Sequence, residues 1–447
     1  MKNPAMRHSP AIPFDPKVNL YSGFGGNMKP YEFTGWRDET MSWKTTAYLA
    51  ANLNPQPTFM LQGPEALKFL SDHCVNNFEW FPVGTCKHAV MCREDGIIMI
   101  HGALIRTGDD EYYSYALAPY IDYLLAKGGY DAVGENISGK VFLFQVAGPR
   151  SLEILEEASG DNLHDIKFAR HRMSRIAGKD VRILRIGMAG TLAYEVHGVI
   201  DDALEVYSAI YEAGQAYGIR RLGQLSYSLF NHTEAGFPQG FIHFPYPWHE
   251  DEGFVEYLKE TGQTTRLTFN LRGSSGQDIT ARYRNPVELG WGGMIKFNHE
   301  FVGREALEKE VANPRRKMVT LVWNKEDIID VYASQFEPGE PYANMDRPSE
   351  KDYLPSIVTY YADKVLKDGR EVGISSGRIF SCYYREMISL CSIDVEFSEL
   401  GTEVIVLWGE EGTRQKGIRA VVSRFPYLNE NRNTDVDVST IPVVSKT

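Results

Sequence analysis

The stretch GMAGTLAYEVHG, residues 187–198, decides how the middle of this chain folds. An apolar run at residues 181–186 precedes it, and a second apolar run follows at residues 192–199. Two such runs joined by a glycine-rich turn predict a β-hairpin. A phosphate-binding glycine loop would instead join a strand to a helix, and no helical pattern follows here. We therefore expect a hairpin with its turn at residues 187–190.

Glu195 is the carboxylate in this stretch. Side chains alternate along a strand, so Glu195 faces away from both Tyr194 and Val196. If its face is buried, an unpaired carboxylate is costly and needs hydrogen-bond donors. A planar heterocycle with adjacent N–H groups would supply them. The alternative, an exposed strand glutamate, is equally compatible with the residues alone.

Working outward, strands and helices alternate without a regular parallel βαβ rhythm. This order predicts an α+β fold with mostly antiparallel sheets. Residues 1–30 are predicted to be irregular, and residues 337–355 to form a surface loop. After residue 313 the sequence changes to short β-like runs separated by turns, which predicts a separate β domain. The expected helices are residues 65–73, 119–127, 151–158 and 202–217. The expected strands are residues 97–105, 111–117, 141–146, 181–186, 192–199, 317–323, 370–375, 387–395 and 402–408.

Composition narrows the function classes. The chain has 447 residues, more than one ordinary core accommodates, with 43% hydrophobic and 24% charged residues. The net charge of −12 argues against nucleic acid or an anionic membrane as a partner. We expect a cytoplasmic protein, since no signal peptide or spanning run is visible and the five cysteines lack a CxxC pair. No metal site is expected, and the oligomeric state is not indicated.

Two further side chains are candidates for chemistry. His101 ends the apolar run at residues 97–100, where a lone strand histidine is more often structural than functional. Tyr227 lies in LSYSLFNHTEAG, residues 225–236, where a helical tyrosine usually serves packing. Neither residue identifies a reaction by itself.

Taken together, the motifs resemble the glycine-cleavage aminomethyltransferase family. The hairpin resembles its folate-binding turn followed by a Phe/Tyr-Glu pair, and NPVELGW (residues 285–291) with FVGREAL (residues 301–307) is similar to a second family signature. GISSG, residues 373–377, resembles a turn of its C-terminal barrel. Stretches at residues 317–324, 331–336 and 406–411 are similar to the tetrahydrofolate-dependent aryl-ether cleaving branch, which includes vanillate and syringate O-demethylases and the sesamin methylenetransferase.

The resemblance implies a three-domain cloverleaf. Its first, folate-binding domain would comprise residues 1–60 and 141–250, and its second residues 61–140 and 251–312. Residues 315–447 would form the C-terminal β-barrel domain.

The resemblance also implies site residues. Glu195 matches the carboxylate that binds the pterin of tetrahydrofolate, and Tyr194 completes the family's aromatic-glutamate pair. Gln145 and Phe237 match a polar and an aromatic position of the folate pocket. Tyr227 falls where the demethylases place an essential tyrosine, although a one-residue length difference leaves Ser228 as a rival.

Departures from the family pattern bear on the substrate. His101 stands where the aminomethyltransferases have a catalytic acid, and Leu117 stands where the vanillate branch has a substrate-gripping arginine. Other pocket positions correspond to Phe24, to Gly26 or Asn27, and to Pro55. A charged hydrogen bond is worth about 1.5–3 kcal/mol, so its loss disfavours an aromatic acid.

The expected substrate is therefore a small, neutral aromatic ether. Within the branch the sesamin type fits best, with a methylenedioxyphenyl group opened to a catechol and its carbon passed to tetrahydrofolate. Tyr227 or His101 would supply the acid that eases departure of the phenol oxygen. Three alternatives stay open: an O-demethylase of a methoxy-aromatic, an aminomethyltransferase-like enzyme acting on a small amine or sulfonium, and a folate-binding protein without catalysis.

Overall fold

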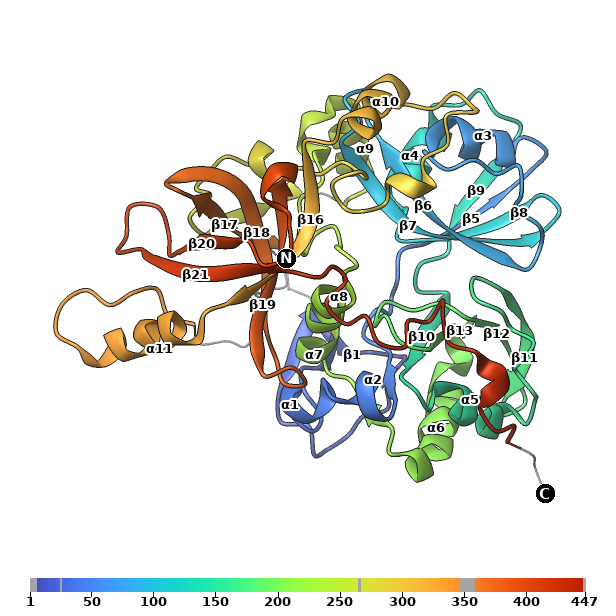
Figure 1. Cartoon of the computed structure of the whole chain (residues 1–447). Helices are drawn as coiled ribbons and strands as arrows, with labels where there is room; N and C mark the ends of the chain where they lie inside the picture. The colour runs from blue at the N-terminus through green and yellow to red at the C-terminus, as the bar shows by residue number, and fades with distance from the viewer. Residues whose placement is uncertain (1–5, 25, 264–266, 346–357, 445–447) are drawn as a thin grey trace.

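The computed structural model describes residues 6–24, 26–263, 267–345 and 358–444. Three lobes surround the middle of the molecule, two of them helix-covered sheets and the third a strand-rich lobe near the C-terminus (Figure 1). Among the described strand pairings, only three are parallel: β1 (Arg7–His8) with β3 (Asn27–Pro30), β4 (Tyr48–Ala50) with β14 (Arg220–Arg221), and β15 (Phe269–Arg272) with β17 (Val358–Lys367). The α+β class with mostly antiparallel sheets is confirmed.

A six-stranded sheet in the order β11-β12-β13-β10-β4-β14 carries the predicted hairpin. Residue Leu184 pairs with Glu195, so β12 and β13 are antiparallel neighbours, as the sequence predicts. One face of the sheet packs against helices α5 and α6, whose buried apolar residues share a core with those of β10 and β13. The strands are β4 (Tyr48–Ala50), β10 (Val141–Ala147), β11 (His171–Ile176), β12 (Lys179–Leu184), β13 (Ala193–Val199) and β14 (Arg220–Arg221).

A five-stranded sheet in the order β6-β7-β8-β5-β9 forms the second lobe. Its core takes in the apolar faces of helices α3, α4, α9 and α10 (Figure 1). The strands are β5 (Thr58–Gln62), β6 (Thr85–Cys92), β7 (Ile98–Gly108), β8 (Glu111–Tyr115) and β9 (Val133–Asn136).

The third lobe is a closed β-barrel. Strands β17, β18, β19, β16, β21 and β20 follow one another, and β20 pairs back with β17. Strand β15 (Phe269–Arg272) extends this sheet beside β17. The predicted C-terminal barrel is thus confirmed, with strands β16 (Arg316–Trp323), β17 (Val358–Lys367), β18 (Arg370–Ser381), β19 (Glu386–Asp394), β20 (Glu403–Trp408) and β21 (Lys416–Ser423).

Two local predictions are wrong. Residues 1–30, expected to be irregular, contain a three-stranded sheet of β1 (Arg7–His8), β2 (Tyr21–Phe24) and β3 (Asn27–Pro30). These strands are only two to four residues long, too short to show the alternation that marks a strand. Residues 373–377 are not a turn but part of β18, where a bulge places Gly377 at φ +67°.

The four predicted helices lie at or within two residues of their expected positions, except that α6 is followed by a 3₁₀ turn over its last three expected residues. Helices α1, α2, α9, α10 and α11 were not predicted. The helices are α1 (Trp36–Glu39), α2 (Ser42–Thr45), α3 (Ala66–His73), α4 (Tyr120–Ala126), α5 (Ser151–Ser159), α6 (Ala203–Gly214), α7 (Gln224–Ser228), α8 (Phe230–Ala235), α9 (Glu252–Glu260), α10 (Arg304–Ala312) and α11 (Lys325–Ala333).

The end of the chain returns to the six-stranded lobe. The backbone N–H of Asn433 donates to Gly190 O at 3.0 Å, next to the hairpin turn. Val438 is buried in the core beneath that sheet, and His164 Nε2 lies 3.0 Å from Ile441 O. A segment that leaves the barrel therefore completes a lobe begun near the N-terminus.

The domain boundaries drawn from the sequence stay a prediction. Strand β15 falls in the range expected for the second domain but pairs with the barrel strand β17. Within the described parts of the chain, no helix has the length and apolar character required to cross a membrane.

Candidate active site

Glu195 lies on the inner face of the six-stranded sheet, with 7% of its surface exposed. Its neighbours Tyr194 and Val196 point the other way, into the core formed with helices α5 and α6. The alternation predicted for this strand therefore holds. Tyr194, expected to contact the cofactor together with Glu195, lies on the opposite face because successive strand residues alternate.

Two side chains hold the Glu195 carboxylate. Gln145 Nε2 donates to Glu195 Oε1 at 3.0 Å, and His197 Nε2 lies 3.0 Å from Glu195 Oε2. The hydroxyl of Tyr48 donates in turn to Gln145 Oε1 at 3.3 Å. Because a carboxylate accepts about four hydrogen bonds, Glu195 keeps capacity for a ligand with adjacent N–H groups.

Several buried polar atoms around this carboxylate make no hydrogen bond within the described structure. They are Tyr227 Oη, both amide atoms of Asn231, and His197 Nδ1. Asn231 lies beside the Tyr48 hydroxyl, and Tyr227 is close enough to Tyr48 and Glu195 for both to affect its pKa. A buried polar group without a partner costs free energy. The cluster therefore suits a polar, planar ligand that satisfies these atoms.

Tyr227 projects from the short helix α7 and is 3% exposed. Burial, with Tyr48 and Glu195 nearby, raises the pKa of its hydroxyl well above the ordinary value, so it stays protonated. The rival Ser228 is already engaged, because its hydroxyl donates to Gln224 O at 2.8 Å in the same helix. The open hydroxyl favours Tyr227 over Ser228.

His101 lies on β7 in a cluster of rings. Its Nδ1 is 3.1 Å from His88 Nε2, and the backbone N–H of Gly240 donates to its Nε2 at 3.3 Å. The ring centroids of Phe237 and Trp291 lie 5.9 and 4.7 Å from that of His101. Burial, and the nearby His88 and His232, lower the pKa of His101 well below its usual value. Both ring nitrogens are occupied and the ring is neutral.

The two sheets meet across this site. The rings of Tyr115 on β8 and His197 on β13 lie 4.6 Å apart. Leu53 packs against both the cluster that contains Tyr227 and the cluster that contains Tyr115. The carboxylate face of the six-stranded sheet thus looks toward the five-stranded lobe.

The residues expected to line the substrate pocket are dispersed. Leu117 has no exposed surface and lies in the apolar core of the five-stranded lobe. Asn27 begins β3, and Pro55 is half-buried in the loop before β5. The side chain of Phe24 lies outside the described residues. The structure therefore brings the cofactor candidates Glu195 and Gln145 together, and it places Leu117 in an apolar core.

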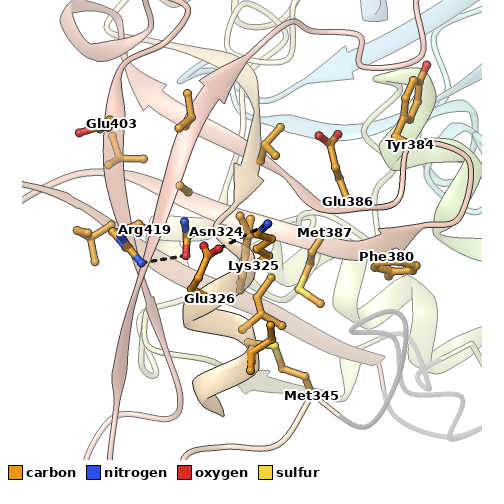
Figure 2. A pocket seen from close by; sticks show the side chains of 18 of the residues that line it. Asn324, Lys325, Glu326, Met345, Phe380, Tyr384, Glu386, Met387, Glu403 and Arg419 are labelled. Atoms are coloured by element: carbon orange, nitrogen blue, oxygen red, sulfur yellow. Dashed lines mark hydrogen bonds and ion pairs between the residues drawn. The ribbon is translucent and has the colours of Figure 1, made fainter. Parts of the chain in front are cut away.

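A groove of about 1200 Å³ lies elsewhere, against the barrel. Figure 2 shows Asn324 and Arg419 linked on one of its walls, with Tyr384 and Glu386 on another. None of the residues predicted for the site lines this groove. Nor do the described residues contain a group of three His, Cys, Asp or Glu side chains placed to hold a metal ion.

Sequence reasoning missed several residues. His197 could have been found, since it lies two positions from Glu195 on the same strand face. His88 and Tyr48 required the pairing of strands that the sequence pattern did not reveal. Lys29 is fully buried, donates to Asn52 O at 2.7 Å, and has its pKa lowered to about 7 by burial.

Comparison with known proteins places the chain among relatives. The GCVT N-terminal domain matches residues 19–238. A sesamin methylene transferase from Sinomonas sp. is 46% identical over 95% of both chains. A syringate O-demethylase from Sphingobium sp. is 31% identical over 92% of this chain and 91% of its own.

The fold has a solved counterpart. The crystal structure of the glycine cleavage system aminomethyltransferase T from Bartonella henselae superimposes with a TM-score of 0.66. The match covers 93% of this chain and 96% of that protein at 15% sequence identity, so it establishes the fold alone. With this architecture, and with 46% identity along almost the whole length of one relative, the chain belongs to the GCVT aminomethyltransferase family.

Proposed function

We propose that this chain is a tetrahydrofolate-dependent one-carbon transferase that opens a neutral aromatic ether. Its best substrate is a methylenedioxyphenyl compound of the sesamin type, giving a catechol and 5,10-methylene-tetrahydrofolate. The observation that carries the proposal is the 46% identity, over 95% of both chains, to a sesamin methylene transferase. The syringate O-demethylase is more distant, at 31%.

The buried cluster at Glu195 fits a pterin. Glu195 has open acceptor positions, and Gln145 and His197 fix its orientation. The amide of Asn231 lies buried beside the Tyr48 hydroxyl, and we assign it to a remaining edge of the ring. We assign Glu195 and Gln145 to the pterin edge, and Phe237, which packs against Trp291, to a ring wall.

Each residue then has a defined task. Bound tetrahydrofolate supplies the nitrogen nucleophile that takes up the ether carbon. Glu195 holds it in one orientation, which contributes to rate because two correctly placed reactants need no further ordering. Tyr227, protonated and without a partner among the described residues, donates to the oxygen that leaves.

A substrate comparison tests the proposal. The protein is incubated with tetrahydrofolate and either a methylenedioxyphenyl lignan, a methoxy-aromatic alcohol or vanillate, and products are identified by mass spectrometry. We expect catechol and 5,10-methylene-tetrahydrofolate from the first compound. Faster turnover of vanillate, with 5-methyl-tetrahydrofolate, would establish an O-demethylase. Turnover of small amines alone, or folate binding without turnover of any ether, would reject the proposal.

Tyr227→Phe tests the assigned acid. Removing this hydroxyl is expected to lower turnover about 10²–10⁴-fold while the affinity for tetrahydrofolate changes less than about threefold. Tyr207→Phe is the matched control, because Tyr207 is buried at the far side of the six-stranded sheet, in helix α6. Near-normal turnover of Tyr227→Phe would remove this residue from the mechanism.

A further inference from the structure

Two histidines on adjacent strands are hydrogen-bonded to each other beside the rings of Phe237 and Trp291. His88 on β6 and His101 on β7 project from the same face of the five-stranded sheet, since His101 pairs with Val90, two residues after His88. His88 Nε2 and His101 Nδ1 are 3.1 Å apart, so one of the two nitrogens carries the shared proton.

The backbone decides which nitrogen carries it. The N–H of Gly240 donates to His101 Nε2 at 3.3 Å, and an amide N–H has no acceptor role. His101 Nε2 is therefore bare, and the proton of this neutral ring sits on Nδ1. His101 Nδ1 then donates to His88 Nε2, which leaves the proton of neutral His88 on its Nδ1. One peptide N–H thus sets the tautomer of both rings.

The two histidine rings differ in their exposure to solvent. His101 is 1% exposed and has both nitrogens engaged, whereas His88 is only half-buried. His88 Nδ1 makes no hydrogen bond to any described residue and is not sealed from solvent. The rings of Trp291 and Phe237 lie 4.6 and 5.2 Å from the His88 ring. The accessible N–H of the pair therefore belongs to His88, whose ring packs against those of Trp291 and Phe237.

His88 also remains neutral at physiological pH. Burial lowers its pKa to about 4. A neutral imidazole donates a hydrogen bond without giving up its proton, and a fixed donor aimed at developing negative charge is worth about 10²–10³ in rate.

We propose that His88 is a catalytic residue whose Nδ1–H donates to the aryl-ether oxygen as its bond to carbon breaks, and that His101 is a positioning residue acting through His88. This inference rests on the proposed function. The electron pair of the broken carbon–oxygen bond goes to oxygen, and the carbon becomes bonded to the folate nitrogen. Tyr227 gives its proton to that oxygen and regains one from the folate nitrogen, so His88 keeps its own and only stabilises the developing charge. The general-acid role considered for His101 therefore stays with Tyr227.

The tautomers can be read without any ligand. In ¹⁵N-histidine-labelled protein at pH 7.5, assigned by the variants His88→Phe and His101→Phe, we expect both rings to carry hydrogen on Nδ1. In His101→Phe the Nδ1–H form of His88 should lose its dominance, because its Nε2 no longer receives a donor. A hydrogen on Nε2 of His88 in the wild-type protein would overturn the inference, whatever the substrate proves to be.

The second test uses leaving groups of graded acidity. Single-turnover rates are measured for methylenedioxybenzenes with and without ring nitro groups, at saturating tetrahydrofolate. His88→Phe should slow the unsubstituted compound about 10²-fold and the nitro compound less than about 10-fold, since a better leaving group needs less help from a donor. Tetrahydrofolate affinity should change less than about threefold. His73→Phe, a half-buried histidine on α3, is the matched control.

The outcomes separate the two proposals. Equal slowing of every compound by His88→Phe would mean that the ring is only structural and would overturn the inference. A large loss of folate affinity would make His88 a folate contact and equally overturn it. If the wild-type protein cleaves no ether, the proposed function fails, while the tautomer measurement still decides the state of the pair.

Discussion

At the scale of single residues, Glu195 is the side chain to which we assign cofactor binding. Its carboxylate is fixed by Gln145 and His197, and Gln145 is itself held by Tyr48. A ligand that meets this carboxylate finds an acceptor pair whose direction is already set. Little side-chain entropy is then lost on binding.

Glu195→Gln should weaken tetrahydrofolate binding about 10- to 100-fold, because a hydrogen bond to a charged group is worth about 1.5–3 kcal/mol. The dissociation constant is measured by titration calorimetry. Glu153→Gln serves as control, since Glu153 is a buried carboxylate on α5 paired with Arg150. Unchanged affinity in Glu195→Gln would contradict the assignment.

The site was only partly predictable at this scale. Period-two alternation places Glu195 opposite Tyr194, and that geometry is what the structure has. The expectation that Tyr194 shares the ligand came from the family pair and ignored this alternation. His88 was missed because residues 85–92, TCKHAVMC, mix polar and apolar residues without a strand pattern. Leu117, identified by its missing charge, is fully buried in the core.

At the scale of elements, the bulge in β18 connects the barrel to the histidine cluster. Gly377 O accepts from Thr233 Oγ1 at 2.9 Å, and Thr233 Oγ1 lies 3.1 Å from His243 Nε2. His243 Nδ1 accepts from the N–H of Gln239, next to the Gly240 that holds His101. The strand thus supports the loop that fixes the histidine tautomers.

Gly377→Ala should destabilise the protein more than an ordinary glycine substitution. Its added Cβ would lie 2.5 Å from His243 Cδ2, at a φ of +67°. The left-handed backbone costs about 1–2 kcal/mol and the overpacking about 1–3 more. Gly369→Ala, at φ +78° with nothing within 4 Å, pays the backbone cost alone. Urea unfolding midpoints of the two variants measure the difference. Equal midpoints would mean that the loop carrying His243 moves away from the added Cβ at no cost in stability.

Elements with a strong pattern were predictable. The hairpin of β12 and β13 and the helices α3 and α5 have regular apolar spacing and stop signals. Strand β17 is ten residues long but was not predicted. It directly follows the Pro- and Asp-rich stretch at residues 337–355, which was predicted to be a surface loop. Helix α11 was missed because its run KEDIIDVYA carries only one fully buried residue, Val331.

At the scale of the whole molecule, one buried ion pair ties distant segments. Lys44 on α2 pairs with Glu234 on α8, and the side chains are 2% and 0% exposed. Glu234 also accepts from Trp43 Nε1 at 3.0 Å and from Ser381 Oγ at 2.6 Å, where β18 ends. The N-terminal segment, the central helices and the barrel thereby meet at one carboxylate.

Glu234→Gln should lower the free energy of unfolding by about 3–5 kcal/mol, because it leaves the Lys44 ammonium buried without its counter-ion. Thermal and urea unfolding measure the loss. Glu308→Gln is the control, since Glu308 pairs with Arg304 at 2.9 Å on the surface of α10 and is worth less than about 0.5 kcal/mol. Similar losses of unfolding free energy in both variants would show that the buried Lys44–Glu234 pair does not hold these segments together.

Acid should destabilise the whole fold through its buried histidines. Burial lowers the pKa of His88 to about 4, and burial with the neighbouring Arg182 lowers the pKa of His171 to about 4, from 6.5. The unfolded chain binds these protons below pH 6.5 and the folded chain does not. Stability therefore falls as the pH drops from 6.5 toward 4, by about 1.4 kcal/mol per pH unit for each ring.

Urea midpoints measured between pH 7 and pH 4.5 test this direction. In His88→Phe the free energy of unfolding should change less steeply with pH, by the equivalent of about one proton, because position 88 then has no ring to protonate. A wild-type protein that becomes more stable over the same descent would disprove the effect.

The return of residues 433–441 to the first lobe has a consequence for how the protein is made. A ribosome releases this segment after the barrel strands have emerged. The turn at Gly190 and the core around Val438 obtain these partners only then. In a nascent chain the barrel can therefore form while the lobe that holds Glu195 still lacks its contacts with residues 433–441. Premature termination just before Asn433 would therefore damage a lobe whose strands were translated before the barrel.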